Sequence, residues 1–373
     1  MKQARKGKLF VFVALAAMFV FPVFAWSKTD VTPLLDEAKK LMDQGNYDDA
    51  LAKCGEAIEK DKNSAKAYVL RGTAYTLKGN YDLALEDTNK AIELDPNDSD
   101  AFVARGNVYY NQTKDNLALA DYDKAISLKS DNAEAHYRRG KLHEVRSEFD
   151  AAIDDYQKSL SINPKNLSLH DGLVYIFNNQ KKYAQTVEAT LKAIEAFPED
   201  SLFRKNLGDA YVQLGQWENA LAAYANAMKL SSTYEVEYYG TEAVLYQKKG
   251  EAQKALKSYS LALEKGKGSG SSNLALYAAN RGFLNFDLKK YEDALVDFQD
   301  AVIANAGSSQ AYLGLAMSYH RLKLAKLTRK AMDKALELEP GLKDIDTFMS
   351  EKGITFSKGQ LEAIKGIVKQ FGY

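Results

Sequence analysis

Four arginines that return at a fixed interval are the residues best suited to chemistry in this chain. Arg71, Arg105 and Arg139 lie 34 residues apart, and Arg281 follows after four such periods plus six residues. Each is followed directly by a glycine. A guanidinium group makes paired hydrogen bonds to a carboxylate or a phosphate. A ladder of arginines would therefore suit an anionic ligand, and the alternative is a set of internal ion pairs.

The interval belongs to a repeat of 34 residues that runs through most of the chain. With Gly72 as position 8 of a unit, nine units align, and small residues recur at positions 8, 20 and 27. Position 8 holds Ala38, Gly72, Gly106, Gly140, Val174, Gly208, Ala243, Gly282 and Ala316. Aromatic residues recur at positions 11 and 24. Small residues at a helix crossing let two backbones approach closely, so the period predicts stacked helix pairs.

This pattern resembles that of the tetratricopeptide repeat (TPR) family over about residues 31–342, with about nine repeats. Repeat 2, YVLRGTAYTLKGNYDLALEDTNKAIELDPND, fits best. The resemblance implies an all-α fold, a right-handed superhelical solenoid of antiparallel helix pairs in which the first helices line a concave groove. Repeat 5 departs most, with Val174 and Thr186 at small positions, and we expect it to pack more loosely or to cross its helices at a different angle.

The nine units also provide an internal test of what the arginines do. Arginine at position 7 occurs with aspartate at position 23, whereas leucine at position 7 occurs with alanine there; Glu37 and Lys53 reverse the signs in repeat 1. Residues that vary together within a unit are expected to touch, and an ion pair that loses one partner leaves a costly unpaired charge. We therefore favour structural ion pairs over a ligand role. The predicted pairs are Arg71–Asp87, Arg105–Asp121, Arg139–Asp155 and Arg281–Asp297.

Other residue types that could support catalysis or metal binding are sparse. His136 and His143 are seven residues apart and share a helix face, which would suit a metal, but they occupy positions where aromatic residues pack in other repeats. His320 is expected to face the groove alone, and Cys54 occupies a core position as a small apolar residue. The sequence contains no glycine-rich phosphate loop, CxxC pair or nucleophile elbow. We therefore expect that the protein is not an enzyme, that it has no catalytic residue, and that it binds no metal and no cofactor.

The concave groove is the surface whose residues say most about a binding partner. In the TPR family, positions 2, 5, 9, 12 and 13 line it. Asparagine can bond a peptide backbone through both ends of its amide, and tyrosine combines a large apolar ring with a polar tip. The alternative is a concave face that is merely solvated. The lysine–asparagine clamp of the family's chaperone-tail binders is absent here. The predicted partner-binding residues are Asn107, Tyr110, Asn111, Tyr137, Lys141, Tyr175, Asn178 and Asn179.

The N-terminus has the composition of a secretory signal. Four basic residues precede an apolar run from Leu9 to Phe24, and Val23 and Ala25 supply the small residues of a cleavage site. We expect residues 1–25 to be removed after Ala25 in a periplasmic or extracellular protein; a retained anchor is the alternative. The remaining predicted boundaries are repeats 1–7 over 26–265, a Gly/Ser-rich joint at 266–274, repeats 8–9 over 275–342, and a C-terminal capping helical segment at 343–373.

These observations predict an exported scaffold or adaptor that binds an extended protein segment in its groove. Nucleic acid is not expected as a partner, because the formal net charge is zero. Membrane contact is expected only through the signal segment if it stays uncleaved. One alternative is an envelope protein that handles a polysaccharide or accompanies glycan export, and another is a non-catalytic assembly factor of a membrane complex.

Overall fold

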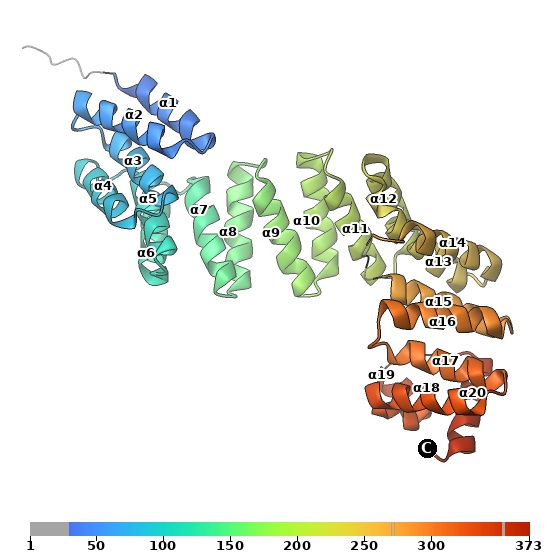
Figure 1. The fold of residues 1–373 in the computed structure, drawn as a ribbon. Coiled ribbons are helices and arrows are strands. Elements are labelled where there is room, and N and C mark those ends of the chain that lie inside the picture. The colour runs from blue at the N-terminus through green and yellow to red at the C-terminus, as the bar shows by residue number, and fades with distance from the viewer. Residues whose placement is uncertain (1–29, 270, 272, 353–354) are drawn as a thin grey trace, which may run out of the picture. The chain divides into compact units, whose positions relative to one another are not determined.

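The computed structural model describes residues 30–373 apart from 270, 272, 353 and 354. The predicted secretory signal at residues 1–25 lies outside the described residues. Every regular element among the described residues is a helix, which confirms the predicted all-α fold (Figure 1). None of these helices combines the length and apolar character that crossing a membrane requires.

The chain forms two compact units, of which the first ends at Arg138 and the second runs from Arg139 to Tyr373. The boundary lies inside α7 (Ala133–Val145). The helices before α7 are α1 (Thr32–Asp43), α2 (Tyr47–Lys60), α3 (Ala65–Leu77), α4 (Tyr81–Leu94), α5 (Ser99–Asn111) and α6 (Asp115–Leu128).

The second unit contains the rest of the helices. They are α8 (Phe149–Ile162), α9 (Leu167–Asn179), α10 (Tyr183–Ala196), α11 (Ser201–Gln213), α12 (Trp217–Leu230), α13 (Glu235–Lys248), α14 (Ala252–Lys265), α15 (Leu274–Asp287), α16 (Tyr291–Ala304), α17 (Ser309–Arg321), α18 (Ala325–Leu338), α19 (Ile345–Lys352) and α20 (Lys358–Phe371), with short 3-10 helices η1 (Ser232–Tyr234) and η2 (Pro340–Lys343).

Each repeat is a helix hairpin whose two members pack through position 8 and position 24. A Cβ atom placed on Gly208 would lie 2.5 Å from the ring of Tyr224, and one on Gly106 would lie 2.6 Å from the ring of Tyr122. Real Cβ atoms do not approach another carbon so closely. In repeats 3, 4, 6 and 8 the glycine at position 8 therefore makes room for a buried ring from the second helix of the same hairpin, whereas in repeat 2 Gly72 faces Thr88.

The turn of every hairpin contains one residue in the left-handed region at position 15. Glycine adopts this conformation without strain, as Gly79 does at φ 78°. Thr113 adopts it at φ 58°, which costs energy for a β-branched residue. The helical spacing of the family thus imposes the same turn on repeats with and without glycine.

Two irregular regions of the second unit fall where the period breaks. Repeat 5 keeps the period, and a cavity of about 750 Å³ opens between α8, α9 and α10 there. Val174 and Thr186 do not line this cavity and are both buried, so looser packing around them stays a prediction. The 3-10 helix η1 contains the extra residue near Tyr234. The Gly/Ser-rich stretch 266–274 connects α14 to α15, and its role as a joint stays a prediction.

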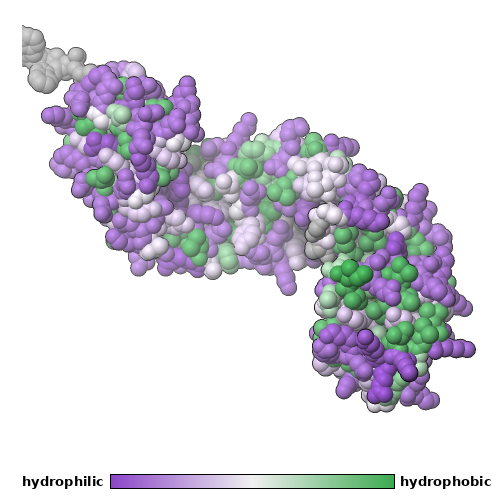
Figure 2. Space-filling view, in the orientation of Figure 1, coloured by the Kyte–Doolittle hydropathy of each residue, from purple (hydrophilic) through white to green (hydrophobic). Residues whose placement is uncertain are grey.

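The C-terminal helix α20 begins with the capping box expected from Ser357 and Gln360, and both of its hydrogen bonds are formed. The helix packs against α15, α17 and α18. Apolar side chains gather over α15, α16 and α17 in the view of Figure 2. Ile303 on α16 is 83% accessible.

Candidate functional site

The arginines of position 7 are paired within their own hairpins. In three hairpins the guanidinium group donates two hydrogen bonds of 2.7–2.9 Å, one to each oxygen of the position-23 aspartate. In repeat 8, Arg281 donates twice to one oxygen of Asp297, at 2.8 and 2.5 Å, and Asn285 donates to the other at 2.8 Å. The aspartates are buried, so their charge is satisfied inside the hairpin.

Repeats without arginine fill the same two positions in other ways. Lys53 lies 3.0 Å from Glu37 in repeat 1, and Ser258 donates to Glu242 at 2.7 Å in repeat 7. Where leucine and alanine replace the pair, both side chains are buried, as Leu207 is in repeat 6. An ion pair and an apolar contact are therefore alternative solutions for one helix crossing.

Arg105 and Arg281 also bond to the preceding repeat, a contact that the covariation within single repeats does not indicate. Arg105 donates to the side-chain oxygen of Asn89 at 2.8 Å, and Arg281 donates to the hydroxyl of Ser260 at 3.0 Å. Both acceptors occupy position 25. An alignment of position 7 with position 25 of the preceding unit could have found this contact.

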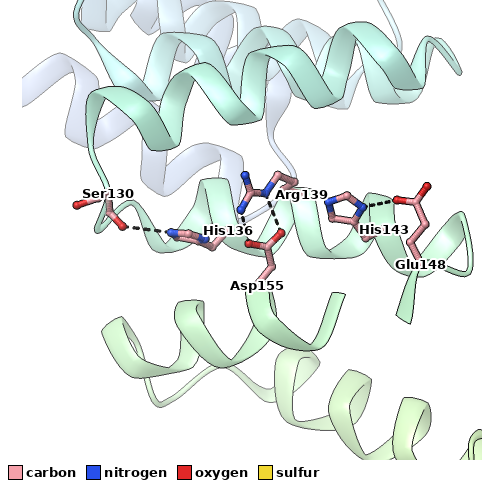
Figure 3. A network of polar contacts seen from close by, with 6 residues as sticks. All are labelled: Ser130, His136, Arg139, His143, Glu148 and Asp155. Atoms are coloured by element: carbon pink, nitrogen blue, oxygen red, sulfur yellow. Dashed lines mark hydrogen bonds and ion pairs between the residues drawn. The ribbon is translucent and has the colours of Figure 1, made fainter. Parts of the chain in front are cut away.

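Helix α7 carries a second set of polar contacts (Figure 3). His136 is buried, as predicted for a core histidine, and its Nε2 atom lies 3.1 Å from the carbonyl oxygen of Ser130. His143 is only half-buried, and its Nδ1 atom lies 2.5 Å from Glu148. The two histidines therefore have different partners. Within the part of the chain that the structure describes, no group of three or more His, Cys, Asp or Glu residues is arranged to hold a metal.

The predicted groove residues of the first unit are partly engaged inside the chain. Tyr122, whose ring is buried, donates its hydroxyl to the side-chain oxygen of Asn107 at 2.9 Å. Asn111 donates to the backbone oxygen of Asn107 at 2.7 Å. These bonds occupy amide groups that the sequence reading assigned to a ligand. Tyr110 and Tyr137 are half-exposed, and the guanidinium group of Arg138 lies 5.2 Å from the ring centre of Tyr137.

The predicted groove residues of the second unit are more accessible. Tyr175 is 56% exposed, and on the same helix, α9, Asn179 is exposed and Asn178 is half-buried. Lys141 lies 3.1 Å from Glu144, which also accepts the hydroxyl of buried Tyr156. Tyr175 is therefore the predicted residue with the most surface to offer a partner.

A cavity of about 800 Å³ in the concave face of repeats 6 and 7 was not predicted. Its lining includes Lys205, Asp209, Glu237 and Gly240, which occupy groove positions 2, 5 and 9 of these repeats, and it reaches Asn178 of repeat 5. A glycine at position 5 occurs only in repeat 7. That departure from the pattern could have indicated that a large side chain, here the ring of Tyr277, packs against α13 at this point.

The concave face of repeats 8 and 9 is not open, because α20 covers it. His320, expected to face the groove alone, lies against this helix: a Cβ atom on Gly366 would be 3.1 Å from its Nε2 atom. Burial, followed by the charge of Arg321, lowers the pKa of His320. Ser357 and Gln360 donate to the carboxylate of Asp287 on α15 at 2.5 and 2.9 Å.

Cys54, the single cysteine of the sequence, is completely buried. Burial raises the pKa of its thiol to about 11. A thiol that stays protonated is a poor nucleophile, which agrees with the expected core role.

Comparisons with known proteins find the same repeat along the chain. Family models described as tetratricopeptide repeat match residues 65–98, 133–166 and 179–235, and one described as TPR repeat matches residues 114–144. A TPR repeat-containing protein of Methanocaldococcus jannaschii is 29% identical over 189 residues, which are 49% of this chain and 32% of the relative. The chain thus spans about a third of the length of that relative.

Solved structures of similar proteins cover about half of the chain. YrrB, described as a TPR protein with an unusual peptide-binding site, is 24% identical over 48% of this chain and 91% of its own, with a TM-score of 0.41. PilW, described as a widely conserved type IV pilus biogenesis factor, is 16% identical over 53% of this chain and 92% of its own, with a TM-score of 0.44.

Proposed function

Because the chain belongs to the tetratricopeptide repeat family, we propose that it is a scaffold that binds an extended segment of another protein on its concave face. The observation that carries the proposal is the exposure of Tyr175, a large amphipathic side chain at a groove position. It lies on α9, and the cavity in the concave face of the same unit begins at Asn178 of that helix. Aromatic side chains of this kind dominate the energy of many protein interfaces.

The test begins with a partner purified together with the full chain from its native host and identified by mass spectrometry. Replacing Tyr175 with Ala is expected to weaken binding of the identified segment by about 2 kcal/mol, measured by calorimetry. Tyr137→Ala is the equivalent change in the first unit. Lys124→Ala and Lys158→Ala, which alter exposed residues of second helices, are the matched controls and should bind normally.

The outcome decides between the proposal and its alternatives. If the tyrosine variants bind as the wild type does, with unchanged circular-dichroism melts, the concave face is not the binding surface. If the purified material is an envelope glycan and no protein is present, the polysaccharide alternative replaces the proposal.

We also propose that the protein is exported and that its mature form starts at Trp26. The basic start, the apolar run and the small residues before the cleavage site support this. N-terminal sequencing of protein from the cell envelope tests it. A chain that still begins at Met1 in the membrane fraction would show a retained anchor.

A further inference from the structure

The cavity in the concave face of repeats 6 and 7 has a chemistry of its own. We propose that it takes up a positively charged side chain, arginine or lysine, of the bound protein segment. This inference rests on the proposed function and names the chemistry of one contact in it.

One wall of the cavity depends on a glycine that lies where other repeats have a side chain. A Cβ atom on Gly240 of α13 would lie 2.1 Å from the Cζ atom of Tyr277. The ring of Tyr277, which comes from α15, therefore occupies the space beside Gly240 and forms part of the cavity wall. Tyr224 contributes a further ring from α12, and the lining also includes Trp217, whose ring already has the ammonium group of Lys248 at 5.0 Å from its centre.

The charged groups of the cavity do not balance. The carboxylate of Asp209 is fully engaged, because it accepts the hydroxyl of Tyr224 at 2.6 Å and lies 2.6 Å from the ammonium group of Lys205. Glu237 contributes a second carboxylate, and its Oε2 atom is buried without a hydrogen-bond partner. Two carboxylates and one ammonium group leave one negative charge.

Burying a charged oxygen without a hydrogen-bond partner costs folding free energy. The unpaired Oε2 atom of Glu237 therefore points to a partner that the free protein lacks. A cationic side chain would donate to this oxygen. Aromatic rings favour the same ligand, because the negative face of a ring attracts a cation. An anion would be repelled by Glu237, and an apolar side chain would leave its oxygen unpaired.

The phenol groups of Tyr224 and Tyr277 do not contribute to the negative charge of the cavity, because both stay protonated. Burial, followed by the charge of Glu237, raises the pKa of Tyr277 well above its usual range. Burial, followed by the charge of Asp209, does the same for Tyr224. The net negative charge therefore resides on the carboxylates, where a guanidinium or ammonium group can neutralise it.

The experiment selects phage-displayed random dodecapeptides on the full chain and measures the affinity of the selected peptides. We expect arginine or lysine to recur at one peptide position. Replacing that residue with norleucine, which keeps the aliphatic chain without the charge, should weaken binding about tenfold or more, as expected for the loss of a charge-assisted hydrogen bond.

The matching change in the protein is Glu237→Gln, which should weaken the basic peptide by a similar factor and leave the norleucine peptide unaffected. Glu235→Gln is the control on the same helix, because Glu235 is already paired with Lys265 at 2.9 Å and does not line the cavity. The melting temperature of free Glu237→Gln should rise, since the variant removes an unpartnered charge. A folding defect would lower it instead.

Two outcomes overturn the inference and separate it from the proposed function. If the selected peptides carry no recurrent basic residue, yet need Tyr175 for binding, the scaffold function stands and the cavity assignment is wrong. If no peptide is selected above the background of the uncoated surface, both the assignment and the proposed function are contradicted.

Discussion

Repeats 6 and 9 are hairpins of the same kind, but the concave face of repeat 6 is charged and that of repeat 9 is apolar. At groove positions 5 and 9, repeat 6 has Lys205 and Asp209, which line an open cavity. Repeat 9 has Leu313 and Met317 at these positions, and both are completely buried in a cluster that includes Ile364 of α20. The side chains at positions 5 and 9 of a first helix therefore distinguish an open groove from one that the chain itself covers.

The covering helix is held by both apolar and polar contacts. Ile364 and Ile367 are completely buried. Arg321 of α17 donates to the backbone oxygen of Gly359 at 3.1 Å, and the capping residues of α20 bond to Asp287. The charged face of repeat 6 offers no comparable apolar surface, so burying such a helix there would not offset the desolvation of Lys205 and Asp209.

The largest loss of stability is expected when a buried side chain of α20 is removed from the covered groove. Ile364→Ala should destabilise the C-terminal part of the second unit by about 4 kcal/mol, because it leaves a cavity under α20. Denaturant unfolding and hydrogen exchange of residues 358–371 measure this. Lys369→Ala, an exposed change on the same helix, is the control. Unchanged exchange in Ile364→Ala would mean that α20 does not depend on the groove, and the comparison would fail.

Hairpins with an ion pair at positions 7 and 23 and hairpins with leucine and alanine there should support the groove equally well. Arg105→Leu alone should cost about 3 kcal/mol, because it leaves the buried carboxylate of Asp121 without its partner. Adding Asp121→Ala should recover much of this loss, since repeats 5, 6 and 9 use leucine and alanine. Denaturant melts of both single variants and the double variant give the coupling energy. Additive losses would show that the two solutions are not interchangeable.

Replacement of a glycine by alanine should have opposite effects on stability at the open cavity and in the covering helix. Gly240→Ala at the open cavity must displace the ring of Tyr277, and overpacking of about 2 kcal/mol outweighs the gain of up to about 1 kcal/mol that alanine brings inside a helix. The variant should be less stable and bind the basic peptide more weakly.

Gly366→Ala in the covering helix is the matched change. Its nearest neighbour is the edge of His320, which can shift, so the helix gain should dominate and the variant should be as stable as the wild type or more stable. Thermal melts of the two variants side by side measure the difference. Destabilisation of equal size in both would contradict the distinction between a rigid cavity wall and an adjustable helix contact.

The smallest effect concerns pH at the covered groove. Burial under α20 lowers the pKa of His320, so the undocked state, with an ordinary pKa of about 6.5, binds the proton more readily. The stability contributed by docking is therefore complete above that value and is lost as the pH falls below it. Asp287, whose pKa is raised by burial under the same helix, acts in the opposite direction.

Melts at pH 7.5 and 5.5 of the wild type and of His320→Gln isolate this contribution, because Asp287 is present in both proteins. The wild type should lose more stability on acidification than the variant. An equal loss in the two would show that His320 does not titrate against the docked helix.

The sequence by itself determined much of what depends on contacts within one repeat. The 34-residue period predicts the hairpins, and the small residues at position 8 match the rings that pack on them. The partner of Arg105 could be read from covariation with Asp121, because nine units sample the same contact with different residues. The capping box of Ser357 and Gln360 was also readable, since it is a local interaction across three residues.

Only the tertiary structure decided the contacts between repeats. The bond from Arg105 to Asn89, the packing of Tyr277 beside Gly240 and the docking of α20 depend on how side chains meet after the helices have packed. The bond from Tyr122 to Asn107 lies within repeat 3, but the sequence period did not indicate it either. A period within the sequence states which residues occupy equivalent positions, but it does not state the rotation from one repeat to the next. That rotation determines whether a groove position lies open, is bonded from below or is covered, and it follows from side-chain packing at each interface.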